Sequence, residues 1–198
     1  MYTLATPTRE QCLKLIAQVE MPPHIQNHSF MVAEISLYLG RFLKQEYPSL
    51  DLDLLQASAL LHDIAKAPSL TTDESHCELG ARMLEEWGYL HIAPIVEEHA
   101  SLESYRLQGP LNESLIVNYS DKRVKHDEIV SLEDRFYDLM ERYGKTREHK
   151  SRIWRKLDLY RMLEDKIFAR LPISPEEREL MELSPQTYSP MAWESYER

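Results

Sequence analysis

Apolar residues recur at helical spacing along most of the 198-residue chain. The clearest run lies between His24 and Glu46, and Pro48 ends it. The same spacing, read with capping residues and helix breakers, predicts further helices over about 8–20, 53–64, 76–87, 91–99, 111–125, 131–144 and 146–170. No segment alternates apolar and polar residues between hairpin turns. The pattern therefore predicts an all-α fold.

The predicted helices suggest one domain with an appendage. Residues 1–171 have the length and the apolar content of a single helical domain that can bury its own core. Residues 172–198 contain Pro172, Pro185 and Pro190 among scattered aromatic residues. We expect this C-terminal extension to be partly extended or disordered.

Composition and charge narrow the classes of function. The net charge of −10 argues against general binding of nucleic acid or of membranes through the whole surface. No run of about 18 apolar residues predicts a membrane span, and the first residues do not resemble a signal peptide, so we expect a cytoplasmic protein. Basic residues outnumber acidic ones, 14 to 11, only in the segment 121–170. That segment is either an ordinary solvated helix face or the phosphate-facing side of a pocket.

The two cysteines, Cys12 and Cys77, fall on separate predicted helices. We expect both to be reduced packing residues. Cys77 follows His76, but a single thiolate without a second cysteine at metal-ligand spacing does not predict a zinc site.

The dipeptide His62-Asp63 ends the apolar helix predicted over about 53–64, and Ala67-Pro68 stops that helix. An imidazole nitrogen and carboxylate oxygens together suit a divalent cation. Adjacent helical residues point about 100° apart, so both side chains reach one ion only near a helix end. The dipeptide alone is weak evidence. Other candidate ligands lie on neighbouring predicted helices, namely His28, His76, His99 and Asp121.

Taken in order, His28, His62-Asp63 and Asp121 resemble the pattern of the HD-domain superfamily of metal-dependent phosphohydrolases. The segment Leu-Leu-His-Asp-Ile-Ala-Lys resembles its HDIG variant, with Ala65 where that variant often has glycine. The resemblance covers a core of about 24–125, and more loosely the chain to residue 171. It implies a bundle of about seven to nine helices. His24 follows Pro23 and is interpreted as a helix cap or a pocket-lining residue, and His91, His126 and His149 have no motif support.

The resemblance also implies a ligand set. Members with one ion use the four core ligands, and members with two ions add two histidines, placed here like His76 and His99, with Asp63 as the bridge. We favour two ions, and a mononuclear site stays open. Nitrogen-rich sites favour iron, manganese or cobalt, with magnesium possible. Lys66 and Arg123 are candidates to neutralise phosphate oxygens, or else they are solvated surface residues.

The function implied is hydrolysis of a phosphate ester or anhydride by a metal-activated hydroxide, with Asp63, Lys66 and Arg123 as the catalytic candidates. The expected partner is a small nucleotide-like phosphate, and a homo-oligomer is possible. No Gly-Tyr-Pro element follows His99, which disfavours the cyclic-dinucleotide branch. Two alternatives stay open: a di-iron oxygenase on the same ligands, and a non-catalytic helical module.

Overall fold

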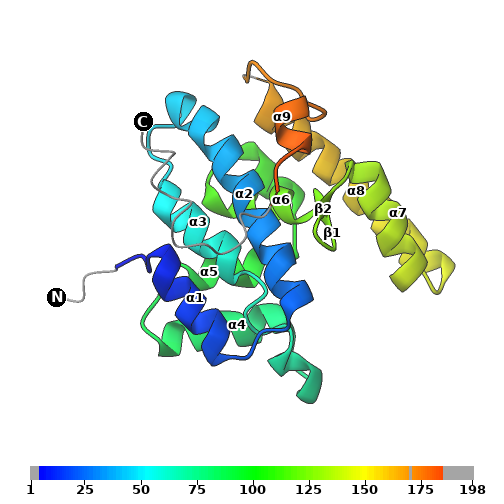
Figure 1. The fold of residues 1–198 in the computed structure, drawn as a ribbon. Coiled ribbons are helices and arrows are strands. Elements are labelled where there is room, and N and C mark those ends of the chain that lie inside the picture. Colours follow the sequence, from blue (N-terminus) through cyan, green and yellow to red (C-terminus); the bar gives the residue numbers. More distant parts are fainter. Residues whose placement is uncertain (1–4, 170, 185–198) are drawn as a thin grey trace.

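The computed structural model describes residues 5–169 and 171–184, and within these ranges it confirms the all-α prediction (Figure 1). The described part contains nine α-helices, two short 3-10 helices and one hairpin of two-residue strands. The α-helices are α1 (Arg9–Gln18), α2 (Pro23–Glu46), α3 (Leu52–Leu61), α4 (His76–Glu86), α5 (Ala93–Glu98), α6 (Glu113–Asp121), α7 (Leu132–Tyr143), α8 (Arg147–Phe168) and α9 (Arg178–Met181). The 3-10 helices are η1 (Pro68–Thr71) and η2 (Ser104–Gln108), and the strands are β1 (Val124–Lys125) and β2 (Glu128–Ile129).

Side-chain caps begin most of the longer helices, as the sequence predicted. Thr8 and Gln11 form a reciprocal capping box at α1. The hydroxyls of Ser131 and Thr146 each accept a backbone N–H in the first turn of α7 and α8. Helix α2 has no side-chain cap and begins instead at Pro23, whose fixed φ suits the first helical position.

Two helices end earlier than the sequence predicted, and both ends shape the site. Helix α3 stops at Leu61, so His62 and Asp63 lie in the turn that follows it. Helix α6 stops at Asp121 instead of continuing to Lys125, and the chain turns into the β1–β2 hairpin. His126, at the tip of this hairpin, has a φ of +58°, which a continuous helix cannot contain.

Helix α2 crosses the centre of the bundle and packs against α3 and α6 (Figure 1). Most of its apolar residues are buried, including Val32, Ile35 and Leu39. Helices α7 and α8 pack on each other at one side of the bundle, and α4 packs on α5. None of the described helices is long and apolar enough to cross a membrane.

The described part of the C-terminal extension, 172–184, lies against the bundle. Leu180 of α9 is fully buried, and the Pro175 carbonyl accepts a hydrogen bond from Arg123. The predicted disorder of the end of the chain falls on residues 185–198, which lie outside the described residues.

Gly80 permits the close packing of α4 on α5 and on the turn that holds Asp63. A Cβ atom at this position would lie 3.1 Å from the Val96 side chain and 3.4 Å from that of Ile64. The missing side chain of Gly80 therefore lets α4 lie close to Val96 of α5.

Replacing Gly80 with leucine should therefore force α4 away from α5. Overpacking of this kind costs about 1–3 kcal/mol of unfolding free energy, measurable by urea denaturation. The matched control, Glu85→Leu on the exposed side of the same helix, should change stability by less than about 0.5 kcal/mol. Equal stability of the Gly80→Leu protein and the wild type would show that this packing is loose.

Candidate metal centre

Three buried histidines are held by backbone carbonyl groups. The Nδ1–H group of His28 donates to the His126 carbonyl oxygen at 3.0 Å. That of His62 donates to Ala59 at 2.7 Å, and that of His99 to Val96 at 2.5 Å. A carbonyl oxygen can only accept, so Nδ1 carries the proton in each ring. All three rings therefore aim Nε2 at one common space, which is the arrangement of metal-binding histidines.

The Asp63 carboxylate lies between two pairs of histidines. Its Oδ2 atom is 3.4 Å from Nε2 of His62 and 3.9 Å from Nε2 of His28. Its Oδ1 atom is 3.6 Å from Nε2 of His76 and 3.7 Å from Nε2 of His99. One carboxylate thus offers a separate oxygen to each pair.

Asp121 lies beside His28 and His62, the two histidines that face Oδ2 of Asp63. The Oδ1 atom of Asp121 is 2.9 Å from Nε2 of His28 and 3.8 Å from Nε2 of His62. Its Oδ2 atom accepts a hydrogen bond from the Lys122 ammonium group, and Asp63 Oδ2 accepts one from Lys66 at 2.6 Å. The sequence-predicted ligands His28, His62, Asp63, His76, His99 and Asp121 are therefore brought together.

Burial and the neighbouring polar groups shift the pKa values of Asp63 and Asp121 in opposite directions. Burial alone would raise the pKa of Asp63, but the nearby His62, His99 and Lys66 hold that pKa well below its usual range. Burial would likewise raise the pKa of Asp121, and the neighbouring Lys122 and His28 lower it well below the usual range. Burial lowers the pKa of His62, which favours the neutral form of that ring. Two carboxylates and a neutral imidazole are the protonation states that bind a cation.

Two buried atoms show directly that this donor set fits a cation. Nε2 of His62 and Oδ1 of Asp63 have no hydrogen-bond partner, although His62 is 0% and Asp63 only 1% exposed. An unpaired buried polar atom costs about 1–3 kcal/mol. Divalent ions bound here would coordinate these two atoms, so the residues present fit a metal centre.

A sequence model described as HD domain matches residues 25–146, which include all six of these ligands. The chain belongs to the HD-domain family. The resemblance drawn from the sequence is therefore confirmed, and proteins of this family are generally hydrolases that bind divalent metal ions. Searches of curated proteins and of solved structures gave no match.

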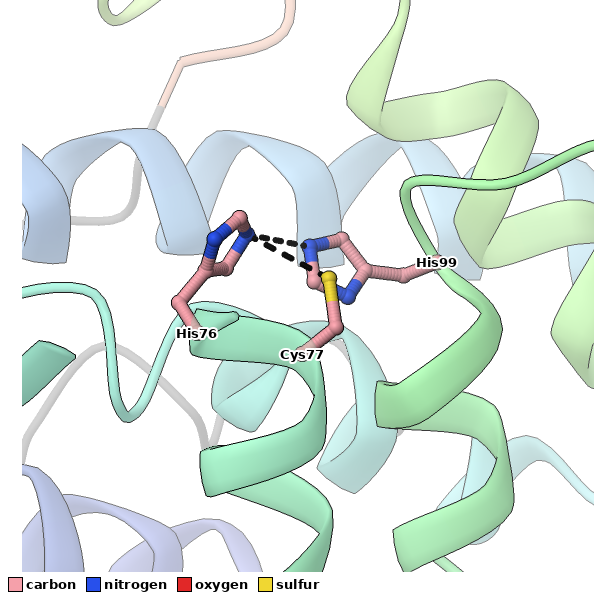
Figure 2. A group of neighbouring side chains, drawn as sticks. All are labelled: His76, Cys77 and His99. Carbon is pink, nitrogen blue, oxygen red and sulfur yellow. Dashed lines mark hydrogen bonds between the residues drawn. The ribbon is translucent and has the colours of Figure 1, made fainter. Parts of the chain in front are cut away.

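We call the six assembled residues the HD centre: His28, His62, Asp63, His76, His99 and Asp121. Cys77 lies beside two of them, and the sequence did not predict it as part of a metal site. Figure 2 shows the Cys77 sulfur between His76 and His99, with Sγ 3.5 Å from Nε2 of His76. Burial would raise the pKa of this thiol, but hydrogen bonds to His76 and His99 and their charges lower it to about 5. Helical spacing could not identify this position, because it does not distinguish Cys77 from any other apolar residue in the first turn of α4.

A cavity of about 320 Å³ opens beside the HD centre. One wall consists of the candidate ligands Asp63, His76, His99 and Asp121 together with the two lysines, Lys66 and Lys122. The opposite wall comes from α7 and α8 and is partly basic and partly apolar, with Arg135, Phe136, Leu139, Tyr143, Ile153, Lys156 and Tyr160. The basic segment of the sequence therefore supplies one side of the cavity.

Arg123 does not reach this cavity. It is 2% exposed, and its guanidinium group donates to the carbonyl oxygens of Val130 at 2.7 Å and Pro175 at 2.9 Å. It also donates to the Tyr119 hydroxyl and forms an ion pair with Glu164 at 3.4 Å. Because α6 ends at Asp121, Lys122 faces the cavity and Arg123 points into the core. The contacts of Arg123 therefore link α6 to other parts of the chain. The sequence had instead predicted a contact with phosphate.

His126 is a second residue that sequence analysis missed. Its left-handed backbone conformation directs its carbonyl oxygen at Nδ1 of His28. Neither the type of a residue nor its spacing along the sequence predicts a backbone carbonyl contact of this kind. His91 contacts Thr6, and His149 lines a neighbouring surface hollow, so neither joins the centre.

Arg123→Ala should destabilise the protein without removing a group that contacts substrate. Removing one partner of a buried ion pair costs about 3–5 kcal/mol. Here Glu164 loses its cationic partner, and two carbonyl oxygens lose their donor. Urea denaturation measures this loss, with the exposed Arg155→Ala as control within about 0.5 kcal/mol. If the Arg123→Ala protein were as stable as the wild type but had strongly reduced turnover, Arg123 would act in catalysis, as the sequence predicted.

Proposed function

We propose that this HD-domain protein is a phosphohydrolase that cleaves a phosphate ester or anhydride of a nucleotide-like substrate with the help of two metal ions. The observation that carries the proposal is the position of Asp63, whose two oxygens face two separate histidine pairs. A carboxylate in this position suits a bridge between two cations.

The ligands divide into two sets around this bridge. His28, His62, Asp63 and Asp121 would hold the first ion, and Asp63, His76 and His99 the second. Such ions lower the pKa of water and polarise a phosphate oxygen when bound. The number of imidazole ligands favours iron, manganese or cobalt over magnesium, which prefers oxygen.

Two lysines of the chain are suited to bind the phosphate. Lys66 and Lys122 each donate to a carboxylate of the centre. Cations on those carboxylates would reduce the lysines' electrostatic attraction to them and leave ammonium donors for the non-bridging phosphate oxygens. Lys66 lies at the open side, with 46% of its side chain exposed, whereas 11% of the Lys122 side chain is exposed. Lys122 thus replaces Arg123 in the proposed phosphate site.

The wall opposite the ligands supports a nucleotide-like substrate. Tyr143 and Phe136 offer apolar faces there, and Arg135 and Lys156 add positive charge. The volume of about 320 Å³ falls within the range of small-molecule sites. The cytoplasmic location and a homo-oligomer stay predictions.

The same ligands support a second candidate function. A di-iron oxygenase uses six histidine and carboxylate ligands, and the six residues assembled here satisfy that number. The lysines beside Asp63 and Asp121 favour phosphate chemistry. Turnover under air and under anaerobic conditions separates the two, since hydrolysis needs no oxygen.

Asp63→Asn should reduce both the metal content and the rate. The variant keeps the shape of the side chain but loses the negative charge that both ions share. We expect close to two ions per wild-type chain, fewer in the variant, and hydrolysis of a phosphoester and nucleotide panel reduced at least a hundredfold, about 2.7 kcal/mol in the barrier. The exposed Asp127→Asn is the matched control.

The individual histidines decide between one ion and two. His76→Ala and His99→Ala should each bring the metal content towards one ion. A fully loaded wild type that holds one ion would contradict the dinuclear centre. Wild-type hydrolysis by Asp63→Asn would overturn the proposed function altogether.

A further inference from the structure

The second ligand set contains one more donor than the HD pattern assigns. The Nε2 atoms of His76 and His99 and the Sγ atom of Cys77 all lie within 4.8 Å of one another. Asp63 Oδ1, which is buried and has no hydrogen-bond partner, points at the same two histidines. Four potential ligand atoms therefore lie close together, and Figure 2 shows the three residues other than Asp63.

The separations of these atoms match the edges of a metal-centred tetrahedron. Bonds of about 2.05 Å to nitrogen and about 2.3 Å to sulfur give edges of roughly 3.3 Å between two nitrogens and roughly 3.6 Å between nitrogen and sulfur. The observed distances are 3.3 Å between the two Nε2 atoms and 3.5 Å between Sγ of Cys77 and Nε2 of His76. Asp63 Oδ1 lies 3.6 Å and 3.7 Å from the two nitrogens, a few tenths of an ångström beyond a tetrahedral edge.

The two cysteines of the chain differ in their surroundings. Cys12 is fully buried in the apolar core, and the partner of its sulfur is the Pro7 carbonyl oxygen at 3.8 Å. Cys77 instead directs its sulfur at imidazole nitrogens from α4 and from the end of α5 (Figure 2). A cysteine that merely fills core volume has no reason to face two metal-binding rings.

We propose that Cys77 supplies a thiolate ligand to the second ion of the centre, which makes that site His76, Cys77, His99 and Asp63. This inference rests on the proposed dinuclear centre and adds a ligand to it. Cys77 binds as the thiolate, with its proton in solvent, and a sulfur lone pair forms the metal bond. The two sites differ as a result: the first has nitrogen and oxygen ligands only, and the second contains sulfur.

The sulfur ligand sets a metal preference. Thiolate selects borderline and soft ions such as zinc, cobalt(II) or iron(II) over manganese and magnesium. Cys77→Ser should therefore weaken zinc binding at the second site at least tenfold. Manganese binding at the first site should stay within about threefold of the wild type.

Cobalt(II) titration of the chelator-treated protein tests the proposal, because a thiolate bound to cobalt absorbs in the near ultraviolet by charge transfer. We expect two cobalt ions per wild-type chain by elemental analysis, and a charge-transfer band that accompanies one of them. The band should be absent from Cys77→Ser and retained in the matched control Cys12→Ala. If either variant does not fold, zinc X-ray absorption of the wild type serves instead, with a sulfur neighbour expected at about 2.3 Å.

The outcomes separate this inference from the proposed function. Two bound cobalt ions without a charge-transfer band overturn the thiolate ligand and leave the dinuclear centre intact. A single bound ion without the band overturns both the second site and its sulfur ligand. Two ions with the band, but no hydrolysis of any phosphoester, support the site and contradict the proposed function.

Discussion

The arrangement of the bundle depends on one buried carboxylate. Asp63 is 1% exposed, yet the neighbouring positive groups keep it ionised. A charge at this depth is stable only if it is paired or bound to a metal. Histidines from α2 and from the ends of α3 and α5, with His76 at the start of α4, surround it. The packing of these helices therefore places four imidazole rings around one carboxylate.

Much of this arrangement could be predicted from the sequence. The long apolar run of α2 and the capping residues of α1, α7 and α8 are local signals, and each predicted a helix that the structure contains. The ordered histidines and aspartates could be joined only through the family pattern, because periodicity says nothing about which helices meet. The HD match over 25–146 confirms that step.

The features that were missed are those set by tertiary contacts. Arg123 follows Lys122 directly, and only the end of α6 at Asp121 decides which of the two faces the cavity. The hairpin conformation of His126 is likewise fixed by what packs around it. The closeness of Cys77 to His99 depends on the first turn of α4 and on the close approach of α5 that Gly80 permits. None of these outcomes is encoded in a single residue type.

Anomalous diffraction from crystals of the metal-loaded protein tests the role of Asp63 most directly. Two anomalous peaks are expected about 3.5–4 Å apart, one beside each carboxylate oxygen of Asp63. The first should lie among His28, His62 and Asp121, and the second beside His76 and His99. A single peak, or two peaks that do not share Asp63, would contradict the bridging carboxylate on which the proposed function depends.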